Sequence, residues 1–529
     1  MQYQFARCRR GGALAFASAL ALGIGGGSRA GRIAVSVSNV TVLQNSVYVG
    51  QPITVGYTLA GSGINVGGIA SVKVEIMNGT TVAKTVTFTP PTGTLRGANS
   101  VSVDTSGVPP AAAYSVRVTA VTAKSSITGP NGTDYYQISD STDPALQFVN
   151  PRGVDVNRNA ASPYFGRVYV TEGRSGIAPG RVTTKGVYIL DADLAETFPG
   201  AEPKARDSGV NGGAWTASAN SPFRVTVGPD DQVYITDWSD PHSGLFIADP
   251  DVNTVQDLFI FPFPPGGQRG TSRGTGDVID ANGAQVYSSI SSVWVEGTGA
   301  ARKVFTADYY GEPMGSIFEY DIPGGQVQWV KPPDKTAVSN NGSINTDSEH
   351  DVVRDSAGNF YVANITTSDQ AVKFDKDGAV VTQIPAIGTG YFGIAIDDAR
   401  NKIALSTNDG RIIFTDKSFA AATPAITTGS SGEVRDVAFD ADGWVYAVDL
   451  TAEALFVYAP PGTYPVSGGQ AVSTQTVAIS RIPLPGDIAP VGPSGLYVGP
   501  NGHRYGDDKV DLQDIVLATR VYAGLATLP

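Results

Sequence analysis

Glu349, His350 and Asp351 are consecutive, and they combine side chains with which proteins move protons and hold cations. An imidazole between two carboxylates can accept a proton during catalysis, or it can join carboxylates from elsewhere in the chain around a cation. Alternatively, the same residues form salt bridges with arginines and have only a structural role. The choice depends on the elements that position them.

Composition predicts a β-rich protein. The chain has 529 residues, and its 63 glycines and 34 prolines make up about 18% of them, against a usual ~12%. Charged residues are 16%, below the roughly 25% of ordinary soluble proteins. Strand-forming and turn-forming residues are abundant, which is typical of all-β proteins. A net charge of −12 argues against nucleic acid or an anionic membrane as a partner and suits an extracellular protein.

Residues 1–30 have the layout of a secretory signal peptide, with a basic start, an apolar stretch, and the small residues Ser28 and Ala30 at its end. The apolar stretch is shorter than the ~20 residues of a spanning helix. We therefore expect cleavage and no membrane span in the mature chain. Cleavage would remove Cys8, the single cysteine. These features indicate a bacterial protein that is secreted or held at the cell surface.

Short alternating strands fill residues 31–130, separated by Gly, Pro and Asn-Gly turns. Strands at this spacing predict a β-sandwich. The run "YTLAG…VKVEI…NSVSVD…YSVRVTA" resembles bacterial Ig-like surface domains. The resemblance implies a spacer or adhesion module.

A repeat begins near residue 149 and has six copies, among them "PFRVTVGPDDQVYITD", "EHDVVRDSAGNFYVAN" and "RDVAFDADGWVYAVD". Each copy has an alternating strand, an Asp/Gly/Asn turn and a second strand of the V-Y-V-x-D kind. The spacings from Asp351 to Gly393 and from Gly393 to Asp436 are 42 and 43 residues, which match a four-stranded propeller blade. The repeat resembles the NHL type of β-propeller. We predict six blades over residues 149–490, and "PSGLYVGPNGHRYGDD" leaves a seventh open.

Stacking the copies places the opening triplet at the start of an innermost strand, at the mouth of the central channel. The predicted mouth residues are Arg152, Arg224, Glu349, His350, Asp351, Arg435 and Asp436. Propellers bind ligands at this position, and the resemblance extends to lyases and lactonase-like hydrolases that work there. His350, Glu349 and Asp351 are thus the catalytic candidates. Ion pairing between the acids and the arginines around a water-filled channel is the other interpretation.

The segment "GDDKVDLQDIVLATRVYAGL", within residues 495–529, resembles half of a dockerin module, a calcium loop followed by a helix. Asp507, Asp511 and Asp514 occupy ligand positions of an EF-hand-like loop. His503 and Tyr505 stand where two further oxygen ligands belong, which puts calcium binding in doubt. A degenerate structural cap on the propeller is the alternative.

The sequence thus predicts a secreted binding or scaffold protein. Its propeller would recognise a glycan, peptide or protein, and its tail would dock to a cohesin-like or cell-surface partner, in a setting of polysaccharide breakdown. A channel enzyme around His350 and a structural surface-layer or matrix component are the alternatives. No nucleotide-binding, G-x-S-x-G or H-E-x-x-H motif is present. Calcium is the one cofactor that the sequence suggests.

Overall fold

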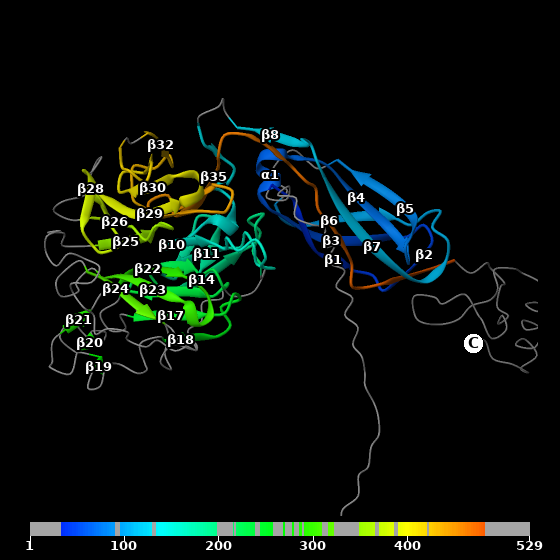
Figure 1. Cartoon of the computed structure of the whole chain (residues 1–529). Helices are drawn as coiled ribbons and strands as arrows, with labels where there is room; N and C mark the ends of the chain where they lie inside the picture. Colours follow the sequence, from blue (N-terminus) through cyan, green and yellow to red (C-terminus); the bar gives the residue numbers. More distant parts are fainter. Residues whose placement is uncertain are drawn as a thin grey trace, which may run out of the picture.

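The computed structural model describes residues 33–481 except 90–95, 130–133, 198–214, 216–217, 239–243, 258–267, 270–277, 280–284, 288–289, 309–315, 322–348, 366–369, 386–389 and 421–422. Two β-rich units lie side by side, a sandwich and a ring of small sheets (Figure 1). The predicted signal peptide and the predicted tail with its helix lie outside the described residues. Within the described part, no helix has the length and apolar character needed to cross a bilayer.

The sandwich consists of two sheets whose inward residues alternate with outward ones. The first sheet comprises β1 (Ser36–Val42), β3 (Pro52–Ala60) and β6 (Gly97–Asp104). The second comprises β2 (Ser46–Tyr48), β38 (Val477–Ser480), β7 (Ala111–Thr122), β4 (Ile69–Asn78) and β5 (Thr81–Phe88), with β37 (Gln470–Val472) also on β7. Helix α1 (Ser62–Gly67) connects β3 to β4. Buried valines and isoleucines from both sheets form one core.

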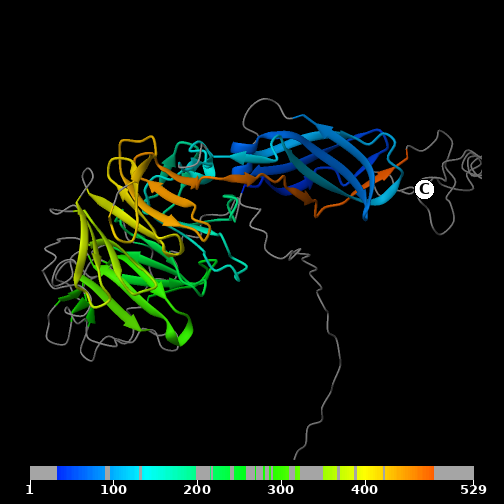
Figure 2. The same cartoon turned by 45° about the horizontal axis from the view of Figure 1, so that its top comes forward.

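The chain returns to the sandwich after it has completed the propeller. β36 (Thr463–Pro465) pairs with β8 (Ser126–Thr128), and β38 lies between β2 and β7 (Figure 2). Val477 and Ile479 are at most 1% exposed in the sandwich core. The predicted propeller boundary at residue 490 is therefore wrong, because a short alternating strand does not reveal which sheet it joins. The propeller is an insertion between strands of the sandwich.

Six sheets radiate from a common axis, which confirms the all-β propeller prediction and, for the described residues, its six blades. Blade 1 has β10 (Pro151–Val156), β11 (Val168–Glu172) and β14 (Gly186–Leu190). Blade 2 has β15 (Val225–Val227), β16 (Val233–Asp237), β17 (Gly244–Ala248) and β18 (Val255–Asp257). Blade 3 has β22 (Ile290–Glu296), β23 (Lys303–Asp308) and β24 (Ser316–Asp321).

The remaining blades each have four strands. Blade 4 has β25 (Glu349–Arg354), β26 (Phe360–Asn364), β27 (Gln370–Phe374) and β28 (Val380–Pro385). Blade 5 has β29 (Tyr391–Asp397), β30 (Lys402–Thr407), β31 (Arg411–Thr415) and β32 (Thr423–Thr427). Blade 6 has β33 (Val434–Phe439), β34 (Val445–Asp449), β35 (Ala454–Ala459) and β9 (Tyr136–Gln137).

The ring closes in two ways. The innermost strand β10 of blade 1 packs against β33 of blade 6 as well as against β15 of blade 2. Strand β9 precedes blade 1 in the sequence but completes blade 6 by pairing with β35. The predicted propeller start at residue 149 is thus too late, because a two-residue strand carries no detectable alternation.

Smaller elements decorate this frame. The hairpin β12 (Gly176–Ala178) and β13 (Arg181–Thr183) lies within blade 1. A small sheet of β19 (Gln268–Arg269), β20 (Val278–Ile279) and β21 (Gln285–Tyr287) follows blade 2. Single turns of 3-10 helix occupy Pro144–Leu146, Gly299–Ala301 and Asp398–Arg400.

A β-bulge recurs at the start of the innermost strands. The register against the second strand shifts at the same position in blades 1, 3, 4, 5 and 6. The extra residues are Arg152, Ser291, His350, Phe392 and Arg435. A bulge puts two residues opposite one and turns a side chain away from its regular direction. The repeated bulge therefore decides which side chains meet at the axis.

A shared core joins the two units. Ile33 and Val466 of the sandwich side pack in the same buried cluster as Phe148 and Trp444 of the propeller. A polar contact accompanies it, since the backbone N–H of Ser62 donates to the carbonyl oxygen of Asp193 at 2.8 Å. These contacts fix the propeller against the sandwich.

Candidate functional site

Two rows of side chains form one end of the central channel. The mouth row is made of the bulged residues and their counterpart in blade 2: Arg152, Phe223, Ser291, His350, Phe392 and Arg435. The second row holds the residues that follow: Gly153, Arg224, Ser292, Asp351, Gly393 and Asp436. These rows agree with the alignment of the repeats in the sequence.

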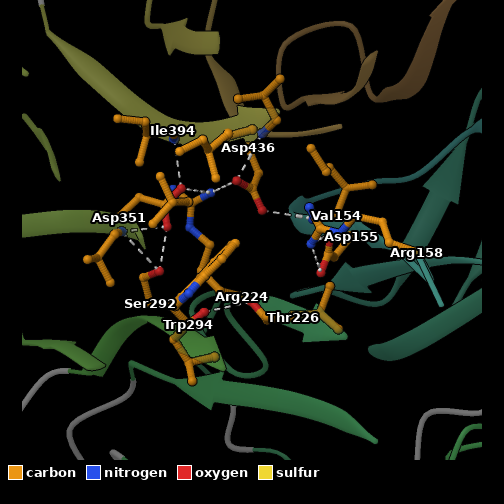
Figure 3. A pocket seen from close by; sticks show the side chains of 18 residues that line it. Val154, Asp155, Arg158, Arg224, Thr226, Ser292, Trp294, Asp351, Ile394 and Asp436 are labelled. Atoms are coloured by element: carbon orange, nitrogen blue, oxygen red, sulfur yellow. Dashed lines mark hydrogen bonds and ion pairs between the residues drawn. The ribbon is translucent and has the colours of Figure 1, made fainter. Parts of the chain in front are cut away.

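Arg224 crosses the channel from blade 2 (Figure 3). Its guanidinium forms an ion pair with Asp436 of blade 6, and its Nη1 lies 3.7 Å from Oδ2 of Asp351 in blade 4. Its Nη2 donates to the carbonyl oxygen of Phe392 in blade 5. The side chain is 2% exposed. One arginine thus ties together four of the six blades.

Asp351 and Asp436 also bind the backbone of the next blade. Asp351 accepts from the N–H of Ile394 at 2.8 Å, and from the hydroxyl of Ser292. Asp436 accepts from the N–H of Val154 at 2.9 Å, which links the last blade to the first. Burial raises the pKa of both carboxyls, more strongly for Asp436, while Arg224 opposes the rise.

A third carboxylate, deeper in the channel, also accepts a hydrogen bond from the backbone of the next blade. Asp155 of blade 1 accepts from the N–H of Val227 in blade 2 at 2.7 Å. The guanidinium of Arg158 binds both oxygens of Asp155, at 2.9 and 3.0 Å. Acidic residues on the innermost strands thus join neighbouring blades.

His350 is fully buried. Its Nδ1 lies 2.7 Å from the carbonyl oxygen of Phe392 and 2.9 Å from Nη2 of Arg224. Because a carbonyl oxygen only accepts, the contact with Phe392 places the proton on Nδ1, and Nδ1 and Nη2 of Arg224 both donate to that carbonyl. Burial, followed by the charge of Arg224, lowers the pKa of His350. The imidazole is therefore neutral.

Aromatic rings close around this imidazole. Phe223, Trp238 and Phe392 each contact His350 edge to face, with ring centroids 5.3 to 5.4 Å apart. Its Nε2 is buried and has no hydrogen-bond partner among the described residues. The histidine that the sequence presents as the catalytic candidate is thus fully buried and enclosed by aromatic rings.

The space left on the axis beside Arg224 is small. Its volume is about 30 Å³, enough to hold a water molecule. Innermost strands of all six blades line it, including Asp155, Ser292, Asp351 and Asp436 (Figure 3). At this level the described side chains leave little space on the axis.

The other predicted mouth residues have separate partners. Arg435 forms an ion pair with Glu433, and its guanidinium lies 4.5 Å from the ring centre of Phe392. The Nε of Arg152 donates to the carbonyl oxygen of Ala219 at 3.0 Å. Glu349 begins β25, but its side chain lies outside the described part. The structural interpretation of the acids is supported for Asp351 and Asp436, which pair with Arg224.

A larger cavity opens at the opposite end of the channel, and we call it the turn-side funnel. Its volume is about 680 Å³. The turns that connect the first and second strands of the blades line it, so all six blades contribute. Its polar and aromatic lining residues include Arg158, Asn159, Trp294, Glu296, Arg354, Asp355, Asp397, Asp398 and Asp440.

Fixed ion pairs hold the polar groups of the turn-side funnel. Glu296 accepts from Nε1 of Trp294 at 3.2 Å and from Nη1 of Arg354 at 2.8 Å. Asp398 accepts from Nζ of Lys417 at 2.5 Å. Burial alone would raise the pKa of Asp398. Its hydrogen bonds, including the one from Lys417, outweigh burial and lower the pKa. Carboxylates at the funnel rim are thus preorganised.

Sequence reasoning missed the funnel. Its residues lie on the Asp/Gly-rich turns of the repeats, which predict chain reversal and nothing more. The available signal was Trp294, the one aromatic residue at its position in the six copies; the other copies have Asp155, Thr226, Val353, Ala395 and Ala438.

A buried acid marks the end of the second strand in blade 1. Glu172 accepts from the backbone N–H groups of Val149 at 2.7 Å, Asn150 at 2.8 Å and Arg174 at 3.0 Å. Burial raises its pKa to about 7 despite these bonds. The residue fixes the chain that enters the blade.

A metal site is not apparent in the described part of the chain, where no group of three or more His, Cys, Asp or Glu side chains could hold an ion. The predicted calcium ligands Asp507, Asp511 and Asp514 lie outside the described residues. Calcium binding therefore stays a prediction.

Comparison with known proteins adds little. No family model and no curated protein matches the sequence. A protein of unknown function from Bacteroides thetaiotaomicron has 13% identity and a TM-score of 0.36, over 80% of this chain and 98% of its own. The WD40 β-propeller domain of Doa1 has 11% identity and a TM-score of 0.38, over 62% of this chain and 97% of its own. The NHL, Ig-like and dockerin resemblances stay predictions.

Proposed function

We propose that this chain is a binding protein whose turn-side funnel holds the end of a glycan. The observation that carries the proposal is the funnel itself, with residues from six blades around about 680 Å³. Sites for small molecules have volumes of roughly 300–1,000 Å³. A short oligosaccharide fits this range.

The chemistry of the lining favours a sugar. Trp294 offers an indole surface that can cover the C–H face of a sugar ring. Around it stand Glu296, Asp398 and Arg354, whose planar groups bind hydroxyls in pairs. Because each of these charged groups already has a protein partner, its position is set before a ligand arrives. Preorganisation reduces the entropy lost on binding.

The same geometry argues against a channel enzyme. A general base has to reach the proton that it removes. His350 is enclosed by three aromatic rings, and its Nδ1 is engaged by the carbonyl oxygen of Phe392. Asp351 is engaged by three donors and by Arg224. Neither side chain is available to a substrate in this arrangement.

The direct test is binding of immobilised short oligosaccharides, neutral, amino and acidic, to residues 31–529. We expect at least a tenfold weaker interaction for Trp294→Ala. Because Trp294 also packs against buried residues, Glu296→Gln serves as a second variant that alters only the rim. Asp104→Asn changes a surface carboxylate of the sandwich and should leave binding unchanged. Retention of no saccharide, or equal retention by all variants, would overturn the proposal.

Export and docking complete the proposal, and they rest on the sequence of residues 1–30 and 495–529. We propose that the tail attaches the protein to a cohesin-like or cell-surface partner in a calcium-dependent way. Calorimetric calcium titration of residues 31–529 and of residues 31–498 tests this. Binding by the longer chain alone supports the tail as a calcium module. Equal calcium binding by both chains, or no binding by either, would rule out the tail as a calcium module.

A further inference from the structure

We propose that the channel mouth opposite the turn-side funnel is an anion site, formed by Arg152 of blade 1 and Arg435 of blade 6. Its ligand is a single carboxylate, phosphate or sulfate group. The site does not depend on glycan binding in the turn-side funnel, since the buried side chains around Arg224 lie between the site and the funnel.

The fold places these two arginines on neighbouring innermost strands. Arg152 and Arg435 are the bulged residues of β10 and β33, which are neighbouring innermost strands. The hydrogen bond from the N–H of Val154 to Asp436 holds the two strands in register. The two arginines therefore occupy equivalent positions on adjacent blades.

Arg152 has no counter-ion among the side chains that the structure describes. It is 8% exposed, and the ion pairs at the channel mouth involve Arg224 and Arg435 instead. Its one hydrogen bond to a described residue is the neutral one from Nε to the carbonyl oxygen of Ala219. Isolating a cation from water without a partner is costly. In agreement, burial and the neighbouring Arg435 lower the pKa of Arg152 to about 9.

The nearby acids whose side chains the structure describes are already engaged. Glu433 pairs with Arg435, and Glu172 binds three backbone N–H groups. Asp351 and Asp436 share the charge of Arg224. His350 stands in the same row and is neutral, so it provides no counter-charge for Arg152. Arg152 is thus the one arginine of the two rows that has no described carboxylate at ion-pair distance, since Arg224 and Arg435 each have one.

The geometry of Arg435 suits an oxyanion. Its guanidinium is placed over the ring of Phe392 at 4.5 Å, which fixes the plane of the group. Its Nε is buried and has no hydrogen-bond partner among the described residues. A guanidinium donates to carboxylate, phosphate and sulfate oxygens alike, and Nε is the nitrogen of Arg435 without a partner among the described residues.

The experiment compares sulfate, phosphate and acetate with chloride at equal ionic strength, by calorimetry and by thermal unfolding of residues 31–529. We expect saturable binding and a rise in Tm with at least one oxyanion, because a ligand of the folded state stabilises it. The three salts separate phosphate or sulfate recognition from carboxylate recognition. Absence of any effect beyond that of chloride would overturn the proposal.

Three variants of equal charge change make the test specific. Arg152→Gln and Arg435→Gln should each weaken oxyanion binding at least tenfold, whereas Arg117→Gln, in the sandwich, should not. In oxyanion-free buffer Arg152→Gln should leave Tm unchanged or raised, because it removes a cation without a counter-ion. A clear loss of Tm for Arg152→Gln, or equal weakening by Arg117→Gln, contradicts an anion site. Trp294→Ala should bind the oxyanion normally, which separates this proposal from the glycan proposal.

Discussion

Asp436 in the last blade accepts a hydrogen bond from the backbone N–H of Val154 in the first blade, at 2.9 Å. The same carboxylate pairs with Arg224, which comes from the second blade. One buried side chain therefore takes part both in closing the ring and in closing the channel.

Removal of Arg224 should be strongly destabilising. Arg224→Met leaves Asp351 and Asp436 buried without their cation, and loss of one partner of a buried pair costs about 3–5 kcal/mol. The free energy of unfolding from denaturant titration measures the loss. Adding Asp436→Asn to Arg224→Met should recover part of it, because one uncompensated charge disappears. Additive losses in the double variant would show that Arg224 and Asp436 do not interact.

Glu172 should make the protein more stable at mildly acidic pH. Its pKa is about 7 when folded and near 4.3 when unfolded. Between these values the folded state holds the proton more tightly, so this stabilisation is complete below pH 4.3 and is lost as the pH rises through 7. The free energy of unfolding, measured from pH 5 to pH 8 for the wild type and Glu172→Gln, gives a difference on the order of 2 kcal/mol between the two ends.

Subtracting the two curves removes the contributions of all other titrating groups, His350 included. A difference that stays constant over this range would mean that Glu172 titrates normally.

His350 should remain neutral in mild acid. Its burial and the adjacent Arg224 both oppose the imidazolium form. Nitrogen NMR of the imidazole should show a protonated Nδ1 and an unprotonated Nε2 that persist as the pH falls to 5. Titration near pH 6.5 would show that the mouth row is open to water.

The innermost strand of blade 1 requires glycine at position 153. A Cβ atom there would lie 2.8 Å from Cα of Arg224 and 2.9 Å from the backbone N of Val225. Backbone atoms cannot yield as a side chain can, so Gly153→Ala should cost about 1–3 kcal/mol. Gly176→Ala is the matched control, since its Cβ would meet only side-chain atoms of Val149, at 3.1 Å or more. Equal losses in thermal unfolding would disprove the close approach of blades 1 and 2.

The sandwich should need its last strands. A chain that ends at residue 461 lacks β37 and β38, which pair with β7 and bury Val477 and Ile479. We expect residues 33–128 to become sensitive to limited proteolysis, while the blades stay resistant. A chain that ends at residue 481 should keep both units resistant. Protection of residues 33–128 in the shorter chain would contradict the insertion.

The sequence predicts the blades well because each one repeats the same local pattern. The copies around Asp351, Gly393 and Asp436 align in the sequence as they do in space, so the rows at the mouth could be foreseen. Contacts between distant segments could not. Neither the partners of Arg224 in blades 4, 5 and 6 nor the place of β38 in the sandwich leaves a local trace.

The burial of His350 could not be predicted from the sequence for a similar reason. Simple alternation sends residues i and i+1 to opposite faces of a sheet. A bulge breaks that rule, and its position is set by pairing with the second strand rather than by residue type. The sequence therefore identifies His350 as unusual but does not reveal that aromatic rings enclose it.

Insertion of the propeller between sandwich strands determines how the molecule carries mechanical load. Tension applied between residues 33 and 481 enters through the first and last strands of the sandwich. There Ile33 and Val35 are bound to Ser467, and β2 lies parallel to β38, so the force shears several hydrogen bonds at once. The propeller is inserted between strands of the sandwich and lies outside this line of force. An attached protein under flow would strain its sandwich while the turn-side funnel kept its shape.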